Sequence, residues 1–122
     1  MHRREAGAER KSPRVPIELP GSLSGRAPRP VTVVDLSTRG CLVRCGSRLD
    51  PGAILDLGVK LDTHYLTTKV RVTEAYLDGT ANDDSYLAGL EFLSLPARDL
   101  IRLRQFLDEE GRRRRSAHAS PP

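Results

Sequence analysis

Two short groups of polar residues have the types and spacing that recognition of a planar, anionic ligand requires. The first is the pair Arg10 and Arg14, and the second is the set Asp35, Ser37 and Gly40. A guanidinium is a planar fork of donors that pairs in bidentate fashion with the O6 and N7 acceptors of guanine or with phosphate oxygens, which lysine does not match. The arginine pair therefore predicts contacts to a guanine nucleotide.

The second group offers complementary chemistry on a candidate strand. Because side chains alternate along a strand, Asp35 and Ser37 are expected on one face, about 6 to 7 Å apart, with Val34 and Leu36 directed into the core. The carboxylate accepts from the N1 and N2 hydrogens of guanine together. Gly40 has no Cβ, which permits either an unusual turn or the close approach of a flat ligand to the backbone. Asp and Ser before Gly are also typical of a plain turn, which is compatible with binding.

The charges separate the two ends of the chain from its middle. Residues 1–30 carry seven basic and three acidic side chains, residues 31–111 carry nine and thirteen, and residues 112–115 are all Arg. A domain that binds nucleic acid through bulk charge would spread a basic face over itself. The pattern favours basic end segments that meet a local anionic ligand or partner, and it argues against nucleic acid.

The 122 residues allow one small domain with irregular ends. Residues 1–9 contain nothing apolar larger than Ala after Met1 and predict a flexible N-terminal arm. Residues 111–122 join four arginines to small and helix-breaking residues and predict a disordered basic tail. No apolar run reaches about 18 residues, and no apolar stretch follows the charged start. We therefore expect neither a membrane span nor export, and a cytoplasmic location.

Between these ends, apolar residues recur with a period of two, which is typical of strands that are buried on one face. Turn signals separate six candidate strands, at residues 15–23, 30–36, 40–45, 54–61, 66–73 and 86–93. Six short antiparallel strands predict an all-β barrel. Pro16 and Pro20 cannot donate to a ladder, so the first strand is expected at an edge or with a bulge.

One helix is expected after the last strand. Ser94 is a candidate cap and Pro96 a candidate start, and an apolar stripe from Ala97 to Leu107 predicts packing against an open barrel end. Gly111 is the expected stop, with a frayed last turn because Glu109 and Glu110 oppose the helix dipole.

Several other residues are assigned to packing or to the surface. Cys41 and Cys45 would lie about 13 Å apart on a strand, beyond the limit of about 7 Å for a disulfide. They also lack the four ligands of a structural zinc, so core positions are expected. His64 beside Asp62 has no candidate nucleophile and is expected at the surface. Three tyrosines, two phenylalanines and no tryptophan are too few for a base-stacking RNA platform.

Arg10-x-x-x-Arg14 followed by Asp35-x-Ser37-x-x-Gly40, on a small barrel ending in Ala88-Gly-Leu-Glu-Phe92 and one helix, resembles the PilZ domain family. The resemblance runs from about Arg10 to Leu107. It implies a six-stranded antiparallel PilZ-type β-barrel with one C-terminal α-helix over residues 10–110. It also implies a receptor that binds the bacterial second messenger cyclic di-GMP and relays the signal to an unidentified protein partner.

Carried over by position, the resemblance implies that Arg10 and Arg14 grip guanine and phosphate. Asp35 and Ser37 would contact a guanine edge, and Gly40 would let the base lie close. Because the arginine arm would order on the ligand, part of the interaction energy, about 2 to 5 kcal/mol, is expected to offset the cost of ordering.

Lys11 and Arg39 are additional candidate contacts. Arg39 stands where similar sequences often have small residues, so it either adds a phosphate contact or crowds the site. Glu9 precedes Arg10 and repels phosphate, which leaves open whether one or two messenger molecules bind. No catalytic residue, metal or cofactor is expected, and the chain is expected to be a monomer or a ligand-dependent dimer. The alternatives are a PilZ-like interaction module that does not bind nucleotide, and a small basic-tailed barrel that binds nucleic acid.

Overall fold

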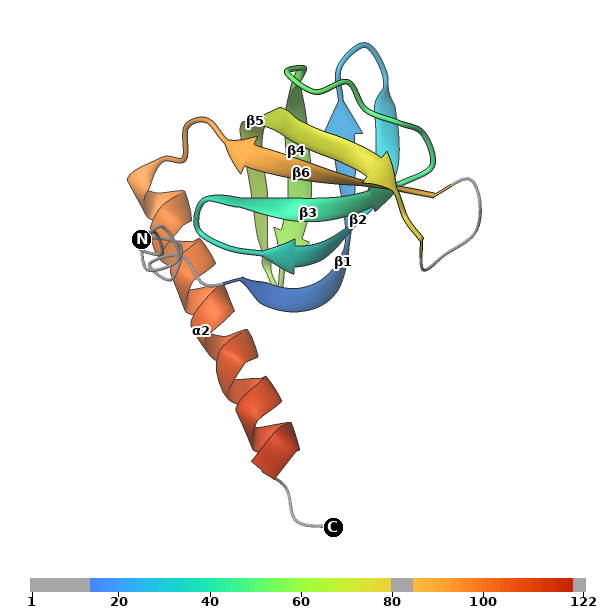
Figure 1. Cartoon of the computed structure of the whole chain (residues 1–122). Helices are drawn as coiled ribbons and strands as arrows, with labels where there is room; N and C mark the ends of the chain where they lie inside the picture. The colour runs from blue at the N-terminus through green and yellow to red at the C-terminus, as the bar shows by residue number, and fades with distance from the viewer. Residues whose placement is uncertain (1–13, 80–84, 120–122) are drawn as a thin grey trace, which may run out of the picture.

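The strands close into a barrel, with the helix following the last strand (Figure 1). The computed structural model describes residues 14–79 and 85–119. Its elements are β1 (Val15–Ser24), β2 (Pro28–Leu36), β3 (Gly40–Cys45), β4 (Ile54–Leu61), β5 (His64–Leu77), β6 (Tyr86–Phe92) and α2 (Ala97–Ala119). All pairings are antiparallel, in the order β1-β2-β3-β6-β5-β4. The predicted six-stranded antiparallel barrel with one C-terminal helix is therefore confirmed.

Alternation along the strands builds the core inside the barrel. On β5, Leu66, Val70 and Val72 are buried, while Thr67, Lys69 and Arg71 are exposed. Thr68 shares the inward face, and its hydroxyl donates to the Ser94 carbonyl over 2.9 Å. This bond satisfies a buried polar group and holds the segment before α2 against the barrel.

Bulges interrupt the alternation on the two strands that carry the candidate site. The β1–β2 register shifts between Pro16 and Leu19, so β1 is bulged as predicted, but closure of the barrel leaves it no edge. The β2–β3 register shifts between Val33 and Asp35. Val33 and Leu36 are therefore the fully buried residues of this stretch, and Val34 is only half-buried. The expectation that Val34 points into the core was wrong, because a bulge resets the side-chain alternation.

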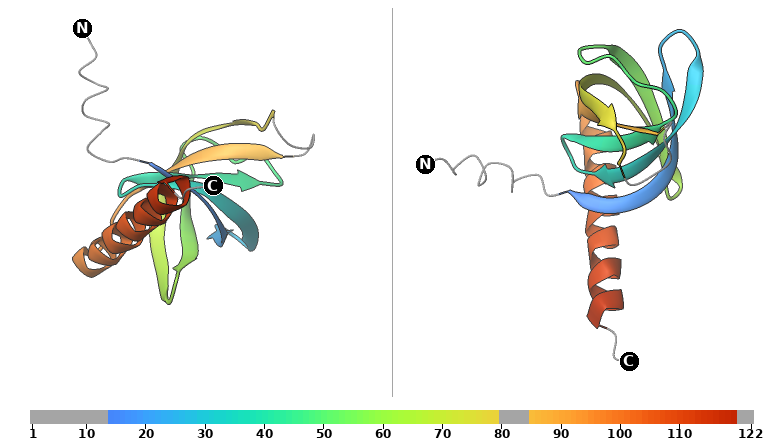
Figure 2. Two further views of the ribbon diagram at one scale, coloured as in Figure 1. Left: turned by 90° about the horizontal axis from the view of Figure 1, so that it is seen from below. Right: turned by 45° about the vertical axis from the view of Figure 1, so that its right-hand side comes forward.

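The helix begins as expected but continues further. Pro96, rather than Ser94, precedes its first residue, and the Pro96 carbonyl accepts from the Leu100 amide over 2.9 Å. Leu103, Phe106 and Leu107 are buried, and the second half of α2 extends away from the barrel (Figure 2). Among the described residues, no helix has both the length and the hydropathy needed to cross a bilayer.

The predicted helix stop at Gly111 was wrong, because α2 runs on to Ala119. The disorder predicted from residue 111 onward is thus replaced by helix as far as Ala119. A glycine inside a helix costs only about 1 kcal/mol relative to alanine. Arg113 offsets this cost by pairing with Glu109 and Glu110 on the preceding turn. Arginines near a helix C-terminus also interact favourably with its dipole.

Candidate ligand-binding site

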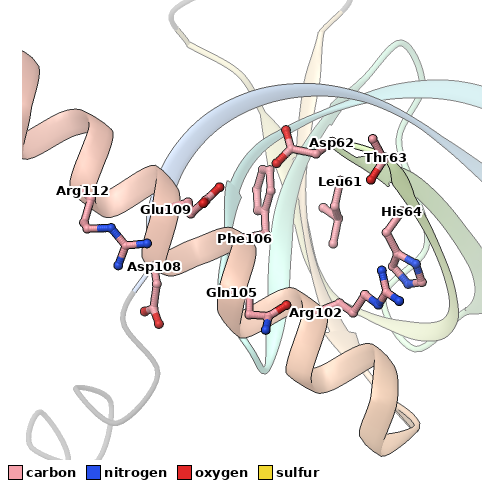
Figure 3. A pocket seen from close by; sticks show the side chains of 10 residues that line it. All are labelled: Leu61, Asp62, Thr63, His64, Arg102, Gln105, Phe106, Asp108, Glu109 and Arg112. Carbon is pink, nitrogen blue, oxygen red and sulfur yellow. The ribbon is translucent and has the colours of Figure 1, made fainter.

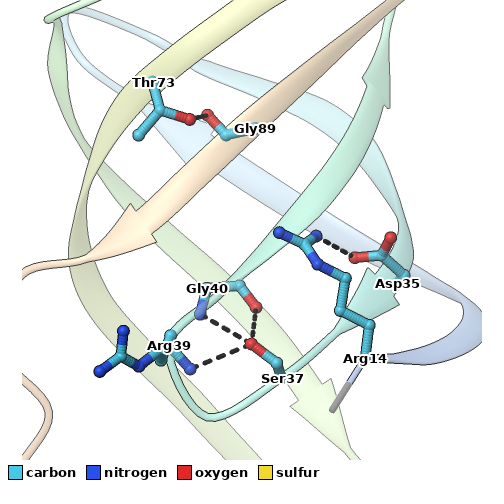
Figure 4. A network of polar contacts seen from close by, with 7 residues as sticks. All are labelled: Arg14, Asp35, Ser37, Arg39, Gly40, Thr73 and Gly89. Carbon is cyan, nitrogen blue, oxygen red and sulfur yellow. Dashed lines mark hydrogen bonds and ion pairs between the residues drawn. The ribbon is translucent and has the colours of Figure 1, made fainter. Parts of the chain in front are cut away.

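An ion pair joins the segment before β1 to the end of β2, next to the β2–β3 turn (Figure 4). Arg14 Nη1 donates to Asp35 Oδ1 over 3.0 Å, and the two side chains are 63% and 21% exposed. The β1–β2 register explains the contact, because Pro16 lies directly opposite Asp35. Pairing of two strands that are adjacent in the sheet thus brings together the predicted guanidinium and the predicted carboxylate.

Ser37 organises the turn between β2 and β3. It is only 4% exposed, and its Oγ accepts from the backbone amides of Arg39 (3.1 Å) and Gly40 (3.2 Å). The Ser37 amide in turn donates to the Gly40 carbonyl over 2.9 Å. The plain-turn interpretation is therefore confirmed, and the hydroxyl is largely occupied within the turn. A contact from Ser37 to guanine stays a prediction.

Gly40 is needed for the fit between two strands. A Cβ at this position would lie 2.0 Å from the Leu90 carbonyl oxygen on β6. The close backbone approach that the bare glycine permits is therefore to β6, and contact with a ligand stays a prediction. Ser37 and Gly40 together place the turn firmly beside Asp35.

Arg39 lies at the exposed tip of this turn. Its main chain is held on both sides, because its amide donates to Ser37 Oγ and its carbonyl accepts from the Phe92 amide over 2.9 Å. Figure 4 shows its side chain pointing away from Arg14 and Asp35. Its guanidinium forms no ion pair with any residue in the described ranges. Arg10 and Lys11 lie outside the described residues.

The surface beside Asp35 contains one residue that the sequence reasoning missed. Leu42 on β3 is directly opposite Asp35, and Gly89 on β6 is directly opposite Leu42. Thr73 on β5 donates its hydroxyl to the Gly89 carbonyl over 3.2 Å. The carboxylate is thus flanked by the half-buried Leu42, whose apolar side chain suits one face of a ring, while Gly89 is buried beside the Thr73 and Glu74 side chains. Only the cross-strand register reveals this row.

The two cysteines are free and buried, as predicted. Burial, and then the nearby Asp35 carboxylate, raises the pKa of the Cys41 thiol from 9.0 to about 12, against an opposing effect of Arg14. Burial also raises the pKa of Cys45, with the Ser47 backbone and Arg29 opposing. Neither thiol is therefore a nucleophile at neutral pH.

His64 is not the surface residue that was expected. It is half-buried, and its Nε2 lies 3.1 Å from Asp99 Oδ1 in the first turn of α2. A cavity of about 360 Å³ lies beside this contact, between α2 and the β4–β5 turn (Figure 3). Side chains of both charge signs line it, and they include none of the predicted ligand contacts. In the described ranges, no group of three His, Cys, Asp or Glu residues is arranged to hold a metal ion.

The sequence was also compared with models of known protein families. Residues 8–109 match the family described as the PilZ domain. The chain therefore belongs to the PilZ domain family. Comparison with functionally curated proteins gave no significant match.

Solved structures share the fold at low sequence identity. The Bacillus subtilis inhibitor of motility (MotI/DgrA) superposes with a TM-score of 0.76 at 18% identity, covering 93% of this chain and 53% of that one. The PilZ domain of Escherichia coli YcgR, solved with c-di-GMP, gives 0.70 at 12% identity, with coverages of 91% and 98%. The K. pneumonia MrkH–c-di-GMP complex gives 0.70 at 18% identity, with coverages of 85% and 54%. The chain spans about half the length of MotI/DgrA and of MrkH.

Proposed function

We propose that this chain is a receptor for cyclic di-GMP. The observation that carries the proposal is the Arg14–Asp35 pair, which sets a guanidinium fork and a carboxylate 3.0 Å apart on the barrel surface. The fork matches the O6 and N7 acceptors of guanine, and the carboxylate matches its N1 and N2 donors. Membership of the PilZ domain family supports the proposal, as do the c-di-GMP complexes of YcgR and MrkH.

Ligand binding requires the Arg14–Asp35 ion pair to open, so that each side chain contacts the ligand instead. An exposed ion pair contributes only about 0 to 1 kcal/mol, so opening it costs little. The half-buried Asp35 then accepts hydrogen bonds from the guanine edge, while the more exposed Arg14 donates to guanine or to phosphate. Arg10, Lys11 and Arg39 are proposed as further cationic contacts, and Ser37 and Gly40 as the turn that sets the position of the base.

The proposed role is that of an adaptor with no catalytic step. Ligand binding orders the arginine segment across the barrel and thereby creates or hides a surface for a protein partner. Charge-assisted contacts contribute about 1.5 to 3 kcal/mol each and so offset an ordering cost of about 2 to 5 kcal/mol, which suits reversible binding. Because the proposed ligand is a second messenger inside bacterial cells, the proposed location is the cytoplasm.

Calorimetric titration of the full chain with cyclic di-GMP tests this proposal. We expect saturable binding by the wild-type chain and at least a tenfold loss of affinity in Arg14→Ala and Asp35→Ala, given about 1.5 kcal/mol or more per charge-assisted contact. Arg26→Ala is the matched control, because Arg26 is an exposed arginine at the β1–β2 turn. A folded wild-type chain that gives no saturable signal would overturn the proposal and leave a protein-interaction module of the same fold.

A further inference from the structure

A second cavity, of about 370 Å³, lies at the end of the β2–β3 hairpin away from the Ser37 turn. Its lining residues include Thr32 on β2, Arg44 on β3 and Ser85 just before β6. Thr32 and Arg44 are direct cross-strand partners, so both lie on the same face of the sheet. Figure 1 shows β3 between β2 and β6, so the lining residues come from two adjacent strands, β2 and β3, and from the segment that leads into β6.

Arg44 is held in place by a buried acid. Its Nε donates to Asp78 Oδ2 over 3.0 Å, and the Asp78 side chain is 1% exposed while that of Arg44 is 37% exposed. The Asp78 amide also donates to the Ser85 carbonyl over 2.9 Å, which fixes the acid relative to the cavity wall. One edge of the guanidinium is therefore anchored, so little rotamer freedom remains to be lost on binding.

The two Nη atoms form the outer edge of the same guanidinium. Within the described ranges, the Nη atoms of Arg44 form no hydrogen bond or ion pair. Thr32 and Ser85 line the same cavity, and a hydroxyl group is able to donate to an oxygen ligand. Asp78 neutralises part of the positive charge of Arg44. A second cation, Arg29, lies near the cavity, since it opposes the rise in the pKa of the lining residue Cys45. A planar pair of donors beside two hydroxyls is complementary to an oxyanion.

We infer that Arg44, Thr32 and Ser85 form a second anion-binding site, which takes a phosphate group. This site is distinct from the Arg14–Asp35 pair but lies on the same strands. Leu42 is opposite Asp35, and Arg44 is two residues further along β3, a separation of about 7 Å. The phosphate therefore belongs either to the dinucleotide held at Asp35 or to a separate small ligand. Only the first of these sources rests on the proposed function.

Titration of the isotopically labelled full chain with inorganic phosphate, followed by NMR at constant pH and ionic strength, tests the site. We expect saturable shifts of the Arg44 Nε–Hε and Gly46 amide signals in the millimolar range. Thr32→Val removes one hydroxyl without changing the shape of the side chain and should weaken this binding by about fivefold. Arg44→Lys keeps a charge beside Asp78 but loses the fork, and should abolish saturation.

Arg98→Gln, an exposed arginine on α2, is the control and should leave the shifts unchanged. Shifts that stay linear in phosphate concentration, or that persist undiminished in folded Thr32→Val and Arg44→Lys, would overturn the inference. The Thr32 variant keeps the test decisive even if Arg44→Lys fails to fold.

A second titration, with cyclic di-GMP, identifies the source of the phosphate. A tenfold or greater loss of affinity in Arg44→Lys assigns the site to a phosphate of the dinucleotide. Unchanged affinity, together with saturable binding of inorganic phosphate, assigns it to a separate phosphorylated ligand. If the wild-type chain does not bind cyclic di-GMP but still binds phosphate at Arg44, the receptor proposal is contradicted and this site is supported.

Discussion

Arg14 Nη1 lies 3.0 Å from Asp35 Oδ1, so the arginine that precedes β1 and the acid on β2 neutralise one another at the barrel surface. The two groups proposed to recognise a guanine are therefore each other's partners. The ligand must replace a contact between them, and the strength of that contact decides how easily it does so. Both side chains are accessible to solvent, Arg14 more than Asp35, which keeps the contact weak.

Asp35→Asn separates the binding role of this acid from any structural role. The amide keeps the size of the side chain but loses the charge, so affinity for cyclic di-GMP should fall at least tenfold. Stability should change by less than about 1 kcal/mol, because the pair is exposed. Calorimetry and urea unfolding measure the two effects. Asp56→Asn removes the exposed Asp56–Lys69 pair elsewhere on the barrel and should change neither quantity much. Equal affinities of wild type and Asp35→Asn would contradict the assigned role.

Gly40→Ala tests whether the glycine serves the fold. The new methyl group would lie 2.0 Å from the Leu90 carbonyl oxygen, which forces β3 and β6 apart. We expect a loss of unfolding free energy of about 3 kcal/mol or more, measured by urea unfolding. Gly46→Ala is the matched control, since no atom lies within 4 Å of the added Cβ. If Gly40→Ala proved as stable as Gly46→Ala and lost only ligand affinity, the glycine would serve the ligand instead.

Ser37→Ala removes the acceptor for the two amides of the turn. Because Ser37 is buried, those amides gain no water in exchange, and the cost should be about 1 to 3 kcal/mol. Thermal unfolding measures this loss, with the exposed Ser94→Ala as the control. A variant with wild-type stability would show that the turn keeps its shape without the hydroxyl. Direct contact with the ligand would then be the favoured role of Ser37.

The buried thiol of Cys41 predicts a dependence of stability on alkaline pH. Its pKa rises from 9.0 to about 12 in the folded chain, so above about pH 9 the unfolded thiol ionises while the folded one stays protonated. Stability should therefore fall as pH rises, by up to about 1.4 kcal/mol per pH unit from this group. The comparison is the pH slope of unfolding free energy in wild type against Cys41→Ala. Parallel slopes would show that Cys41 ionises alike in both states.

Local patterns were enough to predict the elements. The period of two between residues 54 and 73 identified β4 and most of β5, because inward and outward side chains alternate wherever one face is buried. The Ser37–Gly40 turn was also readable from its residue types. Local reasoning did not reveal the bulge at Val34, which depends on the partner strand. It also stopped the helix at Gly111, because the Arg113 ion pairs that support the next turn were not weighed.

What the sequence by itself determined was the kind of each element and the residue types able to recognise a guanine nucleotide, since both depend on near neighbours in the chain. Only the tertiary structure decided which of those residues meet. The β1–β2 register brings Arg14 to Asp35, and the β3–β6 pairing sets Leu90 against Gly40. Register is determined by contacts between residues far apart in sequence, and a shift of one residue reverses every side chain. No local pattern therefore contained it.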